Sequence, residues 1–108
     1  MKAAVIGYGV MGRKHVSVLS SMKGISLVGV VDPLVSSASP HPLYQSVAQL
    51  LEKTKVDFAV VATSTSSHAA VATTLMIHGV HTLIEKPLTS TTEEARELDR
   101  LSTQQHLH

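Results

Sequence analysis

The sequence contains no cysteine, and aromatic residues make up only 3% of its 108 residues. Without cysteine, neither a disulfide nor a thiolate-bound metal can hold the fold, and a cytoplasmic location is the simplest expectation. The seven histidines are not spaced with carboxylates that would complete a metal site, so we expect no bound metal. Hydrophobic packing is therefore the force that must hold the fold together.

Neither the charged nor the apolar residues form long runs. The formal net charge is +1, and no basic run is present that would follow a phosphate backbone. We therefore expect no nucleic-acid partner. No apolar segment approaches the roughly 20 residues of a membrane-spanning helix, so we expect no membrane association either.

The sequence does contain enough apolar residues for one folded domain. Hydrophobic residues make up 44% of the chain and charged residues 16%, a balance that argues against disorder. A chain of 108 residues is long enough for one domain with a core and too short for two. We therefore treat residues 1–108 as a single domain.

Short apolar runs alternate with helix-like segments along the chain. The predicted strands, which have the composition of buried strands, are residues 3–6, 25–31, 58–62 and 80–84. Predicted helices follow the first glycines, Ser46, a polar turn at residues 63–67, and Thr91, which forms a capping box with Glu94. Residues 34–42 are predicted to form a loop. The alternation predicts a three-layer α/β fold of the Rossmann type: a doubly wound parallel sheet of about five strands in the order 3-2-1-4-5.

The first chemical signal is the turn Gly7-Tyr8-Gly9-Val10-Met11-Gly12, between the first predicted strand and the first predicted helix. A lone pattern of this kind is weak evidence, but its position after a strand and before a helix strengthens it. Gly7 would allow a tight turn, Gly9 would let the backbone approach a pyrophosphate, and Gly12 would let helix and strand pack closely. The free N–H groups of the helix would bind the phosphates. All six residues are therefore predicted to bind a dinucleotide.

Asp32 ends the second predicted strand, about twenty residues beyond Gly12. One interpretation is local, since Asp32-Pro33 is an ordinary start of a turn. In a Rossmann unit, however, a carboxylate here accepts hydrogen bonds from the adenosine ribose hydroxyls. It would repel a 2′-phosphate, and no Arg or Lys lies between Lys23 and Lys53 to offset its charge. We therefore expect NAD rather than NADP as the cofactor, unless a basic residue from elsewhere in the fold reaches the site.

The second chemical signal is Glu85-Lys86-Pro87, at the carboxyl end of the last predicted strand. A Glu-Lys pair is more often a solvated surface pair than a functional one. At this edge of an α/β sheet, where ligands bind, Lys86 is placed to hold or donate a proton to a substrate oxygen during hydride transfer, provided that burial makes its neutral form accessible.

Together these elements resemble the N-terminal domain of the Gfo/Idh/MocA oxidoreductases, the family of glucose-fructose oxidoreductase and inositol dehydrogenase. The matching elements cover nearly the whole chain: the glycine turn with His15 soon after it, Asp32, Ala62-Thr63-Ser64-Thr65-Ser66-Ser67-His68, and Glu85-Lys86-Pro87-Leu88. The resemblance implies that Lys86 is catalytic and lies near the nicotinamide. It also implies a set of residues that line the cofactor cleft, namely Thr63, Ser64, Thr65, His68, Glu85 and Lys86. We expect His15 to be only a packing or surface residue.

Three departures from the family pattern change these expectations. Residues 33–42 form a loop where members usually have a helix, which would leave the adenine side of the pocket more open. Ser64 stands where members often have proline, which would make that turn less rigid. Family enzymes also continue into a second domain that supplies the substrate pocket. We therefore expect this chain to be part of a longer enzyme, to bind the dinucleotide weakly, and to be inactive alone, because hydride transfer needs a positioned substrate.

The leading hypothesis is an NAD-dependent oxidoreductase domain from an enzyme that acts on sugars, polyols or related compounds. Met11-Gly12-Arg13 also suggests a dihydrodipicolinate reductase, although that family's His-rich and Lys-containing segments are missing. A dinucleotide-sensing or interaction module without catalysis is the alternative from another class. In the predicted strand order, residues 80–84 lie at an exposed edge, which would favour self-association with a second copy.

Overall fold

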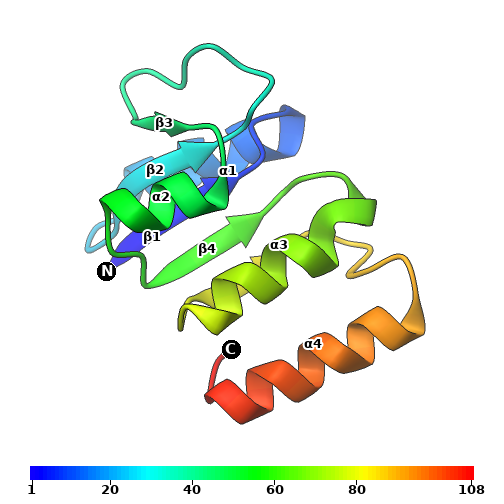
Figure 1. Ribbon diagram of the computed structural model, residues 1–108. Helices are drawn as coiled ribbons and strands as arrows, with labels where there is room; N and C mark the ends of the chain where they lie inside the picture. The colour runs from blue at the N-terminus through cyan, green and yellow to red at the C-terminus, as the bar shows by residue number, and fades with distance from the viewer.

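A five-stranded parallel sheet forms the centre of the computed structural model, which describes residues 1–108 (Figure 1). Its strands are β1 (Lys2–Ile6), β2 (Ser26–Val31), β3 (Leu43–Tyr44), β4 (Phe58–Val61) and β5 (His81–Ile84). They pair in the order β3-β2-β1-β4-β5, as predicted. Every pair is parallel, so the carboxyl ends of all strands meet at one edge of the sheet. The order reverses between β1 and β4, and this reversal point positions the candidate site.

Three helices cover the two faces of the sheet, and the fourth packs against one of them. α1 (Val10–Ser21) covers one face, while α2 (Val47–Lys53) and α3 (Thr65–Ile77) cover the other (Figure 1). α4 (Thr92–Gln105) packs against the outer side of α3, where Leu98 contacts Ala72 and Met76. The predicted three-layer arrangement, with helices on both faces, is therefore confirmed.

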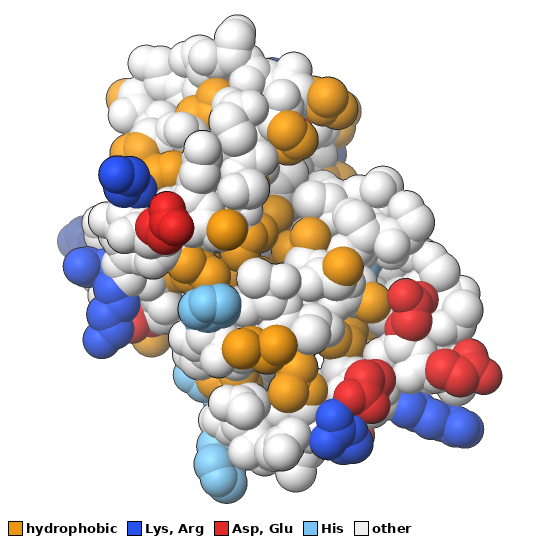
Figure 2. Space-filling model, viewed as in Figure 1, with side chains coloured by type: hydrophobic (Ala, Val, Ile, Leu, Met, Phe, Trp, Pro, Cys, Tyr) orange, Lys and Arg blue, Asp and Glu red, His pale blue; other side chains and the backbone are white.

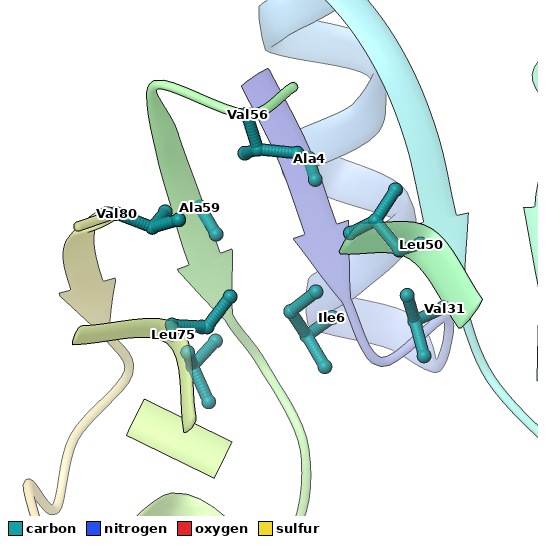
Figure 3. Close-up of a cluster of buried hydrophobic side chains, with 9 residues drawn as sticks. Ala4, Ile6, Val31, Leu50, Val56, Ala59, Leu75 and Val80 are labelled. Carbon is teal, nitrogen blue, oxygen red and sulfur yellow. The ribbon is translucent and has the colours of Figure 1, made fainter. Parts of the chain in front are cut away.

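Alternate residues of the central strands pack on opposite faces, which explains why these strands have continuous apolar sequences. Ala3 and Val5 belong to the cluster beneath α1, whereas Ala4 and Ile6 belong to the cluster beneath α2 and α3. Figure 3 shows the second cluster, with side chains from strands, helices and the loops before β4 and β5 meeting in one layer: Ala4, Ile6, Val31, Leu50, Val56, Ala59, Leu75 and Val80 are labelled. Full burial of a side chain such as Leu75 stabilises the fold by about 1.5–3 kcal/mol.

The structure differs from the predicted elements at two places. Residues 34–42 form the predicted loop, but the two-residue strand β3 that follows was not predicted. α3 begins at Thr65, whereas residues 63–67 were predicted to be a turn and the helix to begin near His68. The Ser67 hydroxyl donates to the Ser64 carbonyl oxygen, 2.8 Å away. Such hydrogen bonds from side chain to backbone occur at helix starts, and here residues 65–67, which are rich in hydroxyl groups, form the first turn of α3.

The predicted caps of two helices are confirmed. The Ser46 hydroxyl accepts a hydrogen bond from the Gln49 N–H at the start of α2. At the start of α4, Thr91 and Glu94 form the reciprocal capping box. Figure 2 shows acidic and basic side chains mixed along the outer surface of α4, in keeping with its position at the solvent side. None of the helices is long and apolar enough to cross a membrane.

Candidate cofactor site

A cleft of about 540 Å³ opens at the carboxyl ends of the central strands. Its walls are the glycine turn after β1, the Asp32 turn after β2, the Thr63 turn after β4, and residues 45–47 at the start of α2. The cleft thus lies where the strand order reverses, which is the usual ligand position in an open α/β sheet.

Two of the three turn glycines are fixed by close packing. Gly7 has a φ of +99°, and a Cβ there would lie 2.6 Å from the Ala62 carbonyl oxygen. A Cβ on Gly12 would lie 1.9 Å from the Gly7 carbonyl oxygen, so α1 meets the strand end with no room for a side chain. No atom lies within 4 Å of the corresponding position on Gly9, so the backbone there is open to a ligand. The positive φ of Gly7 fits the tight turn predicted there, and the close approach at Gly12 fits the predicted packing of helix against strand.

The N-terminus of α1 is left free to bind an anion. Gly9 is its N-cap residue, no side chain caps the helix, and the first turn holds no acidic residue. The N–H groups of that turn and the positive end of the helix dipole are therefore available to a phosphate group. Val10 and Met11 begin the helix with exposed side chains, so their contribution to such a site is their backbone.

Asp32 ties two turns together at one wall of the cleft. Its Oδ2 accepts a hydrogen bond from the Tyr8 N–H at 2.9 Å, and its Oδ1 accepts one from the Leu34 N–H at 2.8 Å. Both interpretations from the sequence thus have a physical basis: the carboxylate shapes the Asp-Pro turn and also lines the cleft. A carboxylate has about four lone-pair sites, so it retains capacity for ribose hydroxyls.

The hydroxyl-rich turn after β4 forms the opposite wall. Thr63 and Ser64 line the cleft, and the Ser67 hydroxyl donates a hydrogen bond to Thr63 Oγ1 at 2.6 Å. Ser67 also lines the cleft, although the sequence prediction did not select it. Thr65 lies in the first turn of α3 and is not among the residues that line the cleft.

Glu85 at the end of β5 is bound by a residue that we expected to be only a packing or surface residue. His15 on α1 lies with its Nε2 at 2.5 Å from Glu85 Oε1, and both side chains are about three-quarters covered (23% and 25% exposed). The hydrogen bond from His15 holds the pKa of Glu85 below its ordinary range, with a further contribution from the Lys86 backbone N–H. His15 therefore connects the helix of the glycine turn to the Glu85-Lys86-Pro87 segment.

His68 lies behind the wall of the cleft rather than on it. Its side chain is 1% exposed, and its ring nitrogens face the carbonyl oxygens of Thr63, Pro87 and Leu88. The structure therefore places this ring outside the walls of the cleft, enclosed between the turn after β4 and the segment after β5.

Lys86 is exposed beyond the end of β5. The backbone around it is held on both sides: the Glu85 N–H donates to the Val61 carbonyl at 3.0 Å, and the carbonyl groups of Pro87 and Leu88 contact His68. The structure thus brings Gly7–Gly9 of the glycine turn, Asp32, Thr63 and Ser64 together around one cleft, whereas Val10, Met11 and Gly12 are not among the residues that line it. It places Glu85 and Lys86 at the same edge of the sheet, outside the walls of that cleft.

A second cavity, of about 590 Å³, lies at the opposite edge of the sheet. It is lined by residues at the amino ends of the strands, including Met1, Asp57 and His81. The pKa of Asp57 is lowered because its carboxylate accepts a hydrogen bond from the Lys2 N–H. Ligands of open α/β sheets bind at the carboxyl ends of the strands, so we assign the site to the other cleft.

Comparison with known proteins identifies the family to which the chain belongs. The family model described as the Gfo/Idh/MocA oxidoreductase family, NAD-binding Rossmann fold, matches residues 1–108. The chain belongs to the Gfo/Idh/MocA oxidoreductase family. Members of this family are oxidoreductases, and the chain is an NAD-binding domain of their type.

Similar proteins include sugar-related family members. The chain is 38% identical to UDP-N-acetylglucosamine 3-dehydrogenase from Acidithiobacillus ferrooxidans, over 99% of this chain and 35% of that enzyme, and the solved structure of that enzyme superposes with a TM-score of 0.89. It is 31% identical to glycosyl hydrolase family 109 protein 2 from Akkermansia muciniphila, over 87% of this chain and 23% of that protein. The structure of GenD2 from gentamicin A biosynthesis, in complex with NAD, is 29% identical, over 99% of this chain and 32% of GenD2, with a TM-score of 0.91. The chain therefore spans about a third of the length of these relatives, or less.

The elements that carry the family resemblance lie at the cleft or beside it, but the sequence alone missed one part of the wall. Gln45, Ser46 and Val47 line the cleft because they follow β3, which ends at the same edge as the other strands. The predicted strand order 3-2-1-4-5 did require a third strand beside β2, and the residues after that strand had to lie at this edge of the sheet. The third strand, β3, has only two residues, which are too few to show the alternation of a strand in the sequence.

Proposed function

We propose that this chain binds NAD in the cleft, with the pyrophosphate at the N-terminus of α1. The observation that carries the proposal is the uncapped helix end at Gly9, open to a ligand, beside the carboxylate of Asp32. In this orientation the adenosine ribose lies at Asp32, and the nicotinamide lies toward Thr63 and Lys86. The relative GenD2, which was solved with NAD, supports the same choice of cofactor.

Asp32 favours NAD over NADP because a carboxylate repels a 2′-phosphate. Arg13 is the basic residue that directly follows the glycine turn, and its guanidinium lies 4.4 Å from the centre of the Tyr8 ring, in a cation–π contact. The test is a fluorescence titration with NADH and NADPH, repeated with Asp32→Ala. We expect NADH to bind more tightly to the wild-type chain and the difference to shrink in the variant.

Two results would contradict this proposal. If neither nucleotide binds the wild-type chain, the cleft is not a dinucleotide site in this chain. If NADPH binds more tightly, the role given to Asp32 is wrong. Asp57→Ala is a matched control, because it removes a carboxylate that also accepts a backbone N–H but lies at the opposite edge of the sheet.

We also propose that a protein containing this domain transfers hydride between NAD and a sugar, polyol or related substrate. NAD supplies the hydride acceptor, and Lys86 takes the hydroxyl proton as the substrate alcohol is oxidised to a carbonyl, or returns it in the reverse direction. The names of the relatives, a UDP-N-acetylglucosamine dehydrogenase and a glycosyl hydrolase, support the substrate class. The family match favours this reaction over that of a dihydrodipicolinate reductase.

The 108-residue chain by itself is proposed to bind the dinucleotide without turnover, because the substrate must be held against the nicotinamide. In practice it then behaves as a dinucleotide-binding module. The test is to follow nicotinamide absorbance with NAD and a panel of nucleotide sugars, free sugars and inositols. Turnover of any of these by the chain alone would contradict the proposal, and turnover abolished by Lys86→Ala would at the same time identify Lys86 as catalytic.

A further inference from the structure

His68 is a titratable residue buried in the protein for which the proposed reaction has no direct use. It lies on α3 with 1% of its surface exposed. Nδ1 lies 3.1 Å from the Pro87 carbonyl oxygen and 3.1 Å from the Leu88 carbonyl oxygen, and Nε2 lies 3.0 Å from the Thr63 carbonyl oxygen. The ring therefore bridges the turn after β4 and the segment after β5.

The groups around this ring all play the same role in hydrogen bonding. All three partners are carbonyl oxygens, which only accept hydrogen bonds. A neutral imidazole has one N–H and one lone pair, so in either tautomer a lone pair would face a carbonyl oxygen. Only the doubly protonated ring supplies a donor to both segments. Its charge is costly to bury, and hydrogen bonds to three carbonyl dipoles are the compensation that the structure offers.

The two segments joined by His68 flank the proposed nicotinamide end of the site. Thr63 is a wall of the cleft, and Pro87 and Leu88 directly follow Lys86. On the other side of Lys86, Glu85 is held by His15 from the opposite face of the sheet. Lys86 itself makes no such contact with a helix, so the direction of its side chain depends on how the backbone around it is held.

We propose that His68 is an imidazolium that positions Lys86 relative to the bound nicotinamide. The positioning role, but not the charge state, rests on the proposed function. His68 acts through the backbone and does not touch the cofactor, so it is a positioning residue and not a catalytic one. The charged side chains nearest in sequence to its partners are Glu85 and Lys86, in the segment after β5, and Glu93 and Glu94, in the first turn of α4.

The charge state is tested on the unmodified chain by nitrogen NMR of ¹⁵N-labelled histidine rings. At about pH 8 an ordinary imidazole is neutral and shows one protonated and one unprotonated nitrogen. We expect one of the seven histidines to show two protonated nitrogens whose hydrogens exchange slowly with water. Its assignment to His68 follows from loss of the signal in His68→Gln. An unprotonated nitrogen on the His68 ring at this pH would overturn the charge assignment, whether or not the chain binds NAD.

The positioning role is tested by nuclear Overhauser contacts in the NADH complex. In the wild type we expect contacts between the Lys86 side chain and the nicotinamide ring, and contacts between the adenosine and the Asp32 turn. In His68→Gln, whose amide can donate to only one of the two segments, we expect the first set to be lost and the second to remain. His78→Gln is the matched control on the same helix, because its exposed ring contacts only the Thr74 carbonyl, one turn away.

The outcomes of this experiment are distinguishable. A wild-type chain that binds no NADH contradicts the proposed function. Contacts of Lys86 with the nicotinamide that persist in His68→Gln overturn the positioning role. Loss of both sets of contacts, together with a collapsed amide spectrum, shows that His68 only stabilises the fold, and this result also overturns the positioning role.

Discussion

Gly12 and Gly9 stand three residues apart in the same turn, but the physical reasons for a glycine at these two positions differ. A Cβ at Gly12 would collide with the Gly7 carbonyl oxygen, and backbone cannot move aside as a flexible side chain can. A Cβ at Gly9 would meet no protein atom within 4 Å. Gly12 is therefore required by the fold, whereas at Gly9 only a ligand would compete for the space.

This contrast predicts opposite phenotypes for two alanine variants. Gly12→Ala should lower the free energy of unfolding by about 3 kcal/mol, the upper end of the usual cost of overpacking, because the clash is with backbone. Gly9→Ala should leave stability within about 0.5 kcal/mol, as for surface substitutions, and should weaken NADH binding. Urea unfolding and a fluorescence titration measure the two effects. Equal stability of the two variants would contradict this account of the turn.

Glu85 carries a pH-dependent contribution to stability. Its pKa is lowered in the folded chain, first by the hydrogen bond from His15. A carboxyl group with a lowered folded pKa stabilises the fold above its unfolded pKa, and this contribution is lost as the pH falls through the folded value. We therefore expect Glu85→Gln to reduce stability near neutral pH, and the difference from wild type to vanish in acid, below the ordinary glutamate range.

Urea unfolding of both proteins across a pH series measures this effect. Glu52→Gln, an exposed substitution on α2, is the control and should show no such pH-dependent difference. A stability difference between Glu85→Gln and wild type that stays constant into strong acid would show that the His15 contact does not depend on the charge of Glu85.

At the scale of elements, α4 depends on its capping box. Thr91 accepts the Glu94 N–H through its hydroxyl, while the Glu94 carboxylate accepts the Thr91 N–H. Thr91→Ala removes the hydroxyl acceptor and should lower the free energy of unfolding by about 1 kcal/mol. Thr92→Ala, one residue later on the exposed first turn, should be nearly neutral. Chemical unfolding followed by circular dichroism measures both changes, and equal losses would show that the cap is not the cause.

The elements that the sequence predicted well are those that follow local rules. β1 and β4 are continuous apolar runs, Ser46 and Thr91 are caps, and the glycine turn has fixed spacing. β3 was missed because two residues are too few to show the alternation of apolar and polar side chains that marks a strand. Its pairing with β2 also depends on the rest of the sheet. The start of α3 was missed because hydroxyl side chains favour turns and helix starts alike, and the choice depends on local hydrogen bonds.

The candidate site was predictable only in part, for a related reason. The positions of the glycines and Asp32 follow from the geometry of their turns, and each turn is determined by a few neighbouring residues. The contact of His15 with Glu85 joins residues 70 positions apart on different elements, so no local pattern indicates it. The burial of His68 likewise depends on where the segment after β5 crosses α3.

At the scale of the whole molecule, the two edges of the sheet differ. β3 is short, and the loop of residues 34–42 lies beside it, whereas β5 is a four-residue strand that pairs only with β4. The Leu83 side chain on β5 is 58% exposed, and the only backbone group of β5 paired at its outer side is the Thr82 N–H, with the His108 carbonyl. An apolar strand with unpaired backbone groups favours pairing with the same strand of a second copy.

This edge predicts weak self-association of the 108-residue chain. Sedimentation velocity over a concentration series should show a dimer that increases with concentration. Leu83→Lys should shift the equilibrium toward monomer by about tenfold or more, because a charge at an edge strand opposes pairing and the corresponding free energy is about 1.4 kcal/mol. Val18→Lys is the matched control, because Val18 is 57% exposed but lies on α1, where the backbone is already hydrogen-bonded. A wild-type chain that remains monomeric at the highest concentration would contradict pairing through β5, and equal effects of the two substitutions would indicate general hydrophobic association.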